Sequence, residues 1–183
     1  MTKKEKILKS ALTLFVRDGI DATSTARIAK ESGVASGLIF HYFKNKDGLV
    51  QTLFLELKNK ISEINRTRND LSCFTRENFR TMWMNGIRSG MNEIETIRFI
   101  HQFKYSRYIR LEEREKGKSF FTEQHAYFRD GIQKGILKNM DVELMGEIVF
   151  EQMLLVITYI QEGRGSIEDI ESYYKIARDS IFS

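Results

Sequence analysis

Apolar residues recur at helical spacing from the start of the chain. Between residues 3 and 18 they stand three or four positions apart and predict an amphipathic helix: Ile7, Ala11, Leu14 and Phe15. Gly19 ends this helix, and a hydroxyl near Ser24 can accept the free N–H groups of a second helix that begins there. The second helix is short, because Gly33 fits the left-handed conformation that closes a helix.

The same periodicity continues through the rest of the chain. A third helix is expected over residues 36–43, and after a polar break at 44–48 an apolar-periodic stretch predicts a long fourth helix that reaches the mid-sixties. Residues 66–73 are typical of a connection between two modules. The remaining expected helices cover residues 74–91, 94–110, 119–135, 142–162 and 167–182. The chain contains no proline, which is excluded most strongly from helix interiors, so an all-α fold is predicted.

Composition is that of a globular protein. The 183 residues are 42% hydrophobic and 30% charged, which excludes global disorder and low-complexity classes. The longest apolar run, Met153–Ile157, is too short for a membrane span, and the N-terminus has no signal-peptide core, so we expect a cytoplasmic protein without a membrane partner. One cysteine and three scattered histidines give no metal-ligand spacing, and neither a metal nor a cofactor is predicted.

The net charge of +4 is concentrated in one part of the sequence. Residues 1–50 contain nine Lys or Arg and five Asp or Glu, whereas residues 51–183 contain twenty of each sign. A basic module on a neutral body favours a nucleic-acid partner, because cationic side chains displace the counterions that condense on phosphates. The alternative is a solvated N-terminal face with a few extra lysines.

Four residues have the order and chemistry of a helix-turn-helix. Two short helices that cross at a steep angle need a small residue where the backbones touch, a glycine in the turn, and apolar residues that fill the corner. The sequence supplies these in Ala29, Gly33, Val34 and Ile39. In such a motif the second helix places its N-terminal residues in the DNA major groove, while the first crosses the backbone.

A family resemblance lies in the run from Gly19 to Leu49, GIDATSTARIAKESGVASGLIFHYFKNKDGL. It is similar to the N-terminal domain of the tetracycline-repressor (TetR) family of bacterial transcriptional regulators, and the similarity extends over residues 3–50. The resemblance implies an all-helical homodimer, in which residues 1–48 form the helix-turn-helix DNA-binding domain. A long helix would join this domain to a ligand-binding and dimerisation domain over residues 49–183, where a bound inducer releases the operator.

The resemblance also assigns DNA contacts residue by residue. Thr25 and Arg27 fall where the family contacts phosphates at the start of the second helix, and Lys46 falls where it places a phosphate-binding lysine. The expected reading helix comprises Ser36, Gly37, Leu38, Phe40, His41 and Tyr42. Its two small residues let the helix start approach DNA closely, and Leu38 can pack on a thymine methyl. We include Lys44 among the contacts, with plain solvation as the alternative.

Two positions depart from the usual pattern of the family. Ala35 stands where a capping Ser or Thr is usual, and Phe40 stands where Tyr is usual. The missing cap costs about 1 kcal/mol at the start of the helix, and the missing hydroxyl removes one phosphate bond. Two readings of Tyr42 stay open, since it can anchor a phosphate or only brace the domain.

The segment 142–162 is apolar around its whole circumference, so another surface must cover its second face. In the family the last two helices of each subunit form a four-helix dimer interface, and here these would be residues 142–162 and 167–182. A two-fold dimer suits DNA, because it presents two recognition helices to two half-sites. The alternative is that both helices are buried in the core of a monomer.

Aromatic and methionine residues are dense between residues 79 and 128. This composition suits a pocket for a flat or lipophilic molecule, because thioethers and rings adapt to varied apolar surfaces. We expect Trp83, Phe103 and Tyr127 to line such a pocket, with plain core packing as the alternative for each.

The sequence thus predicts a ligand-responsive repressor that binds a palindromic operator on double-stranded DNA as a homodimer and is released by a small lipophilic or aromatic effector. The alternative is an activator, or a ligand-independent DNA-binding protein, of the same fold. An enzyme is not indicated, because the chain has no Ser/His/Asp order, glycine-rich phosphate loop or HExxH helix. The pair Glu112–Glu113 lies in a charged stretch that we expect to be exposed.

Overall fold

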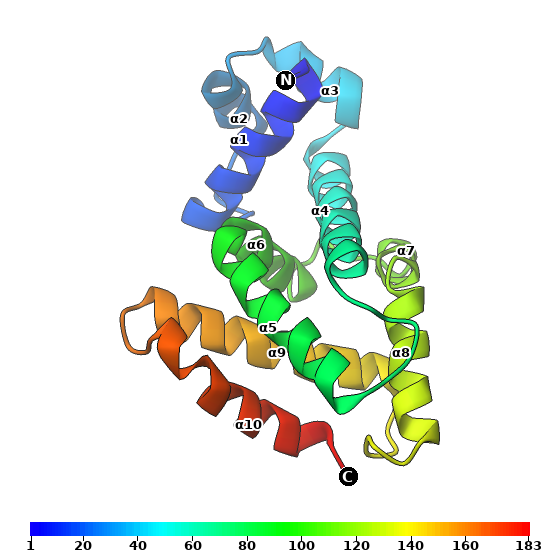
Figure 1. Ribbon diagram of the computed structural model, residues 1–183. Coiled ribbons are helices and arrows are strands. Elements are labelled where there is room, and N and C mark those ends of the chain that lie inside the picture. Colours follow the sequence, from blue (N-terminus) through cyan, green and yellow to red (C-terminus); the bar gives the residue numbers. More distant parts are fainter. The chain divides into compact units, whose positions relative to one another are not determined.

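The protein folds almost entirely into helices, in a computed structural model that describes residues 1–183 (Figure 1). The elements are α1 (Lys3–Asp18), α2 (Thr25–Ser32), α3 (Ser36–Phe43), α4 (Lys46–Arg68), α5 (Arg76–Asn92), α6 (Ile94–Lys104), α7 (Leu111–Ser119), α8 (Thr122–Gln133), α9 (Val142–Gln161), the 3₁₀ turn η1 (Ile167–Asp169) and α10 (Ile170–Ile181). None of the helices combines the length and hydropathy of a bilayer-spanning segment. The predicted all-α fold is confirmed.

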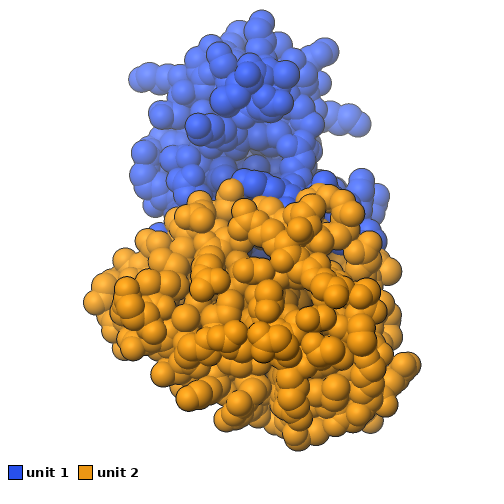
Figure 2. Space-filling view, viewed as in Figure 1, with its two compact units in different colours: residues 1–60, 95–120 blue, residues 61–94, 121–183 orange.

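The chain divides into two compact units (Figure 2). Unit 1 comprises residues 1–60 and 95–120, and unit 2 comprises residues 61–94 and 121–183. Unit 1 therefore contains α1 to α3 together with α7 and nearly all of α6, which come much later in the sequence.

The expected helix over residues 94–110 is wrong at its C-terminal end, because α6 stops at Lys104. Ser106 caps the last turn: its backbone N–H and its hydroxyl both donate to the carbonyl of Phe103, at 3.0 and 2.8 Å. A serine side chain can compete in this way with the helical backbone, but no glycine or proline marks the position in the sequence. The result is a loop of six residues, 105–110, between α6 and α7.

Helix α7 is absent from the elements that the sequence predicts. Its apolar periodicity is weak, but its charges suit a helix, since Glu112 stands in the first turn and Lys116 and Lys118 in the last. One expectation for this stretch is also wrong in part: Oε2 of Glu113 is buried and has no hydrogen-bond partner.

The core of unit 1 joins α6 to the N-terminal helices. The buried side chains of α1 are Ile7, Leu8, Ala11, Leu14 and Phe15. Phe15 stacks on Phe99 of α6 at a ring distance of 5.9 Å, and Phe54 of α4 stacks on Phe103 of α6 at 4.1 Å. Such aromatic pairs stabilise a core beyond their simple burial. The segment 95–104 is thus packed as part of the helix-turn-helix unit.

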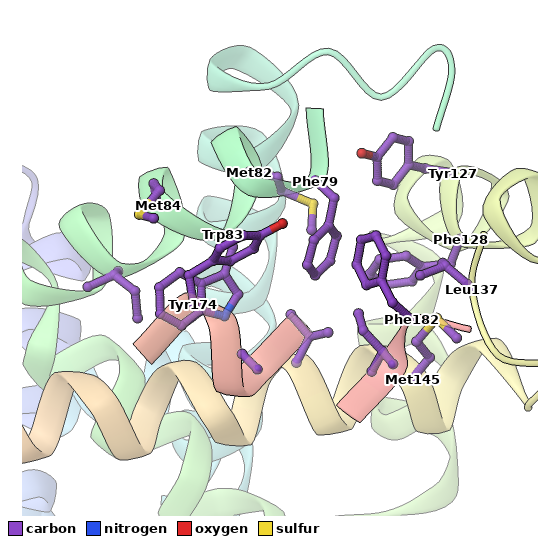
Figure 3. Close-up of a cluster of buried hydrophobic side chains, with 14 of the residues drawn as sticks. Phe79, Met82, Trp83, Met84, Tyr127, Phe128, Leu137, Met145, Tyr174 and Phe182 are labelled. Atoms are coloured by element: carbon purple, nitrogen blue, oxygen red, sulfur yellow. The ribbon is translucent and has the colours of Figure 1, made fainter. Parts of the chain in front are cut away.

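The core of unit 2 is an aromatic cluster (Figure 3). Its buried aromatic members come from the segment before α5, from α5, α8 and α10, and from the chain end: Phe74, Phe79, Trp83, Tyr127, Phe128, Tyr174 and Phe182. Trp83 lies 5.7 Å from Tyr174, ring to ring. Helix α9 adds Met145, Val149 and Ile157 to this cluster.

The charge follows the two units. Unit 1 carries 18 Lys and Arg against 10 Asp and Glu, a net charge of +8, whereas unit 2 carries 11 against 15, a net charge of −4. The contrast is sharper than in the sequence, because residues 95–120 contribute seven cations and four carboxylates to unit 1.

Candidate nucleic-acid interface

Local capping sets the two helices of the motif. The hydroxyl of Ser24 accepts the N–H of Arg27 at 3.2 Å and begins α2, as the sequence predicts. Gly33 ends α2 in the left-handed conformation, with φ of 67°. The N–H of Val34 donates to the carbonyl of Ala29 at 3.1 Å and closes the turn.

Helix α3 begins at Ser36 without a side-chain cap, because Ala35 has no group that could accept a hydrogen bond. Its inner face consists of Ile39 and Phe43, which are buried in the core of unit 1. The other residues of the helix are exposed, except for the half-buried Leu38. An eight-residue helix is marginal in isolation, so its packing in the core of unit 1, with α2 as a neighbour, must hold it in place.

The structure brings the predicted DNA contacts to the outside of unit 1. The exposed ones are Arg27, Ser36, Gly37, Phe40, His41, Tyr42 and Lys44, and the half-buried ones are Thr25, Leu38 and Lys46. Phe40 and Tyr42 remain 52% and 41% exposed. Arg27 is tied to Asp18 by an ion pair of 3.0 Å.

Neither packing within the protein nor backbone conformation requires a glycine at position 37. A Cβ built on it would meet no atom of the protein within 4 Å, and its backbone does not adopt a positive φ. Glycine is a poor helix former, so the residue lowers the stability of α3 without a packing gain. A surface from outside that approaches the backbone of α3 closely would explain it.

Gly48 has the opposite environment. A Cβ there would lie 2.2 Å from the carbonyl oxygen of Phe43, so the start of α4 touches the end of α3 backbone to backbone. Between them, Lys44 adopts the positive φ of 64°, and the side chain of Asn45 accepts the N–H of Gly48 at 2.8 Å. This tight junction fixes the direction in which α4 leaves the turn after α3.

Lys46 lies in the first turn of α4, against residues that the sequence did not indicate. Its Nζ donates to the backbone carbonyl of Asp21 at 3.1 Å and lies 5.8 Å above the ring of Tyr108. Burial lowers the pKa of Lys46, Asp21 raises it in part, and the guanidinium of Arg107 lowers it again. The sequence does not indicate that Asp21 and Tyr108 contact Lys46, because no local signal links residues so far apart along the chain.

The three residues expected to line a ligand pocket are all buried. Trp83 and Tyr127 belong to the aromatic cluster of unit 2 (Figure 3), whereas Phe103 belongs to unit 1 and stacks on Phe54. Nε1 of Trp83 and the hydroxyl of Tyr127 have no hydrogen-bond partner. Burial, and then the charge of Asp70, raise the pKa of Tyr127.

Comparison with known protein families identifies both parts of the chain. Residues 7–53 match the profile of "Bacterial regulatory proteins, tetR family", and residues 75–169 match "Tetracyclin repressor-like, C-terminal domain". The chain belongs to the TetR family. As a TetR-family protein it is a transcriptional regulator with a DNA-binding helix-turn-helix, and not an enzyme.

Curated relatives of this TetR-family regulator match either about a third of the chain or most of it. The HTH-type regulator BetI of Vibrio atlanticus is 37% identical over 60 residues, which cover 33% of this chain and 30% of BetI, so this match spans under a third of that protein. YvkB of Bacillus subtilis is 40% identical over 68 residues, which cover 37% of this chain and 36% of YvkB. The fatty acid metabolism regulator protein of Bacillus subtilis is 24% identical over 157 residues, which cover 81% of this chain and 78% of that protein.

Solved structures resemble the whole chain. A TetR-family regulator from Shewanella sp. PV-4 has a TM-score of 0.88 at 25% identity, with 100% of both chains covered. One from Marinobacter aquaeolei VT8 has a TM-score of 0.88 at 22% identity, with 99% of this chain and 96% of the other covered. The fold of the chain is therefore that of TetR-family regulators.

Proposed function

We propose that this regulator is a ligand-responsive repressor, which binds a palindromic operator as a homodimer and is released by a small lipophilic effector. Residues 1–48 would bind DNA, and residues 49–183 would bind the effector and dimerise. The proposal rests first on the outward face of α3, carried by a unit with a net charge of +8.

The DNA-facing role of α3 is supported by chemistry as well as charge. Phe40 and Leu38 offer apolar contacts to thymine methyls, while His41 and Tyr42 can donate to phosphates or base edges. The rings of His41 and Tyr42 lie 5.3 Å apart in an edge-on arrangement, so the two side chains stand next to each other on α3. Thr25 and Arg27 at the start of α2, with Lys44 and Lys46 after α3, would supply the phosphate contacts.

Dimerisation is supported by an uncovered apolar surface on α9 and α10. Leu144, Leu155 and Ile176 are 51%, 69% and 74% exposed, and all three stand on these two helices. Large exposed aliphatic side chains on neighbouring helices mark an interaction surface. A second copy is the simplest cover, because a two-fold axis buries the same patch on both subunits and presents two recognition helices.

An effector site in unit 2 is supported by two polar atoms without partners. Nε1 of Trp83 is only a donor and the hydroxyl of Tyr127 can donate or accept, and both lie in side chains that are at least 99% buried. Such atoms are rare in native cores, and each calls for a partner. A lipophilic molecule with an oxygen acceptor would provide one. Because the Bacillus subtilis relative regulates fatty acid metabolism, fatty-acyl compounds are the first class to test.

Selection of bound DNA from random fragments tests the operator and the dimer together. We expect an inverted repeat whose half-sites are separated by one or more helical turns. Leu38→Ala should relax the preference at one base position of each half-site. Enrichment of no sequence at any salt concentration would refute the operator proposal.

The effector can be tested with the fluorescence of Trp83, because it is the single tryptophan of the chain. A panel of fatty acids and acyl thioesters should shift or quench its emission and release the selected DNA. Tyr127→Phe, which removes only the hydroxyl, should weaken that response. If the compounds neither change the emission nor release DNA, the ligand-independent alternative is favoured. If transcription of the regulated gene in cells rises when the operator is occupied, the protein is an activator.

A further inference from the structure

Lys46 shares its surface with two arginines from the loop between α6 and α7. Arg107 and Arg110 follow it by about sixty positions in the sequence, yet both are held beside the first turn of α4 within unit 1. The domain boundary expected from the sequence assigns these residues to the body of the protein. In the structure their loop belongs to unit 1, with the helix-turn-helix.

Arg107 is positioned through Asp21. One guanidinium nitrogen of Arg107 lies 3.1 Å from Oδ1 of Asp21, and the hydroxyl of Tyr108 donates to the same oxygen at 2.9 Å. The backbone carbonyl of Asp21 accepts the ammonium of Lys46 at 3.1 Å. Lys46 and Arg107 therefore bind one residue from two elements, and their charges lie close together.

Arg110 is positioned through the residue that follows Lys46. Its guanidinium lies 3.4 Å from Oδ2 of Asp47. The side chains of Arg107 and Arg110 are 75% and 61% exposed. Each guanidinium has five N–H donors, and most of these remain open to a partner. We call Lys46, Arg107 and Arg110 the cationic triad.

The triad keeps a positive charge after its internal pairs are counted. Three cations face two carboxylates, Asp21 and Asp47, and the surrounding unit is strongly basic. Exposed ion pairs of this kind contribute little to stability, so a guanidinium can exchange its aspartate for a phosphate at small cost. Arginine suits phosphate particularly well, since its planar fork matches two phosphate oxygens. The aspartates hold the two arginines in place until such a partner arrives.

We propose that Arg107 and Arg110 extend the phosphate-binding surface beyond the helix-turn-helix, so that the cationic triad contacts the DNA backbone as one unit. This inference rests on the proposed role of Lys46 at a phosphate. It adds a contact segment, residues 105–110, which belongs to neither helix of the motif.

The test measures the affinity for a mixed-sequence duplex long enough for two half-sites, across a range of salt concentrations. Phosphate contacts do not depend on sequence, so the operator need not be known. The double variant Arg107→Gln with Arg110→Gln should lower the slope of log K against log salt by about 0.9 for each phosphate that the variant no longer neutralises. The double variant Arg107→Lys with Arg110→Lys keeps the charge and should restore the slope.

A matched control separates direct phosphate binding from general charge. Arg98→Gln with Arg114→Gln removes the same charge from two other arginines of the same unit and should change the slope less. If the two double variants reduce the slope equally, the inference is overturned. Arg110→Gln alone serves if removal of the Asp21 pair unfolds the double variant, as judged by its melting temperature.

The proposed function and this inference fail in different ways. Without salt-dependent binding by the wild-type protein, both are refuted. If Lys46→Gln lowers the slope while Arg107→Gln with Arg110→Gln acts like the control, the DNA-binding role stands and the extended surface is refuted.

Discussion

Replacing Gly37 by alanine should change stability and DNA affinity in opposite directions. The new Cβ meets no protein atom within 4 Å, so the fold can accept it without a shift. Alanine is the better helix former, and the free energy of unfolding should rise by about 0.5 kcal/mol, somewhat less than the full effect in a helix interior, since Gly37 stands in the first turn of α3.

The same methyl group should weaken DNA binding. If the backbone of α3 approaches a base edge or phosphate at Gly37, the methyl overpacks that contact at a cost of about 1–3 kcal/mol. This corresponds to a Kd between about 5-fold and 150-fold higher, because every 1.4 kcal/mol is a factor of about ten. Urea unfolding would measure the first effect, and anisotropy on the selected operator the second.

Gly146→Ala is the matched control. Its Cβ would lie 3.8 Å from Cε2 of Phe128, an ordinary contact, on α9 in unit 2. This variant should also gain stability, of order 0.5–1 kcal/mol, and should bind DNA like the wild type. An unchanged operator affinity for Gly37→Ala would show that no surface approaches α3 at that position, and the reasoning from the open glycine would be wrong.

Three further variants probe the junction, the dimer and the acid limb of stability. Gly48→Ala forces a Cβ against the carbonyl of Phe43 and should lower the free energy of unfolding by about 1–3 kcal/mol in urea; an unchanged midpoint would contradict the backbone contact. Leu155→Arg adds charge to an exposed apolar site, so sedimentation should give folded monomers with little operator affinity, whereas an intact dimer would refute the interface. The carboxylate of Asp130 accepts a hydrogen bond from Nζ of Lys134 at 2.6 Å, and this bond holds the pKa of the carboxyl below the ordinary 3.8. Its contribution is complete above pH 3.8 and is lost as the pH falls through the lower folded value, so Asp130→Asn should flatten the acid limb of a stability-against-pH curve.

The helix-turn-helix could be predicted because its signals act over a few residues. A hydroxyl at Ser24 caps the next turn, Gly33 closes it, and Ile39 recurs with Phe43 at helical spacing. Each signal acts on residues a few positions away along the chain, so it can be recognised without knowledge of the tertiary structure. The end of α6 could not be predicted in this way, because Ser106 caps the helix and a serine does not reliably mark a helix end.

The helical fold, the motif and the exposed positions of α3 follow from signals in the amino-acid sequence alone. Long-range packing, in contrast, groups residues 95–120 with the N-terminal helices, leaves Gly37 open while it crowds Gly48, and brings Lys46 to a loop about sixty positions away. Periodicity and capping depend on nearest neighbours along the chain. Ion pairs, backbone approach and the grouping of charge depend on which distant surfaces the packed core brings together.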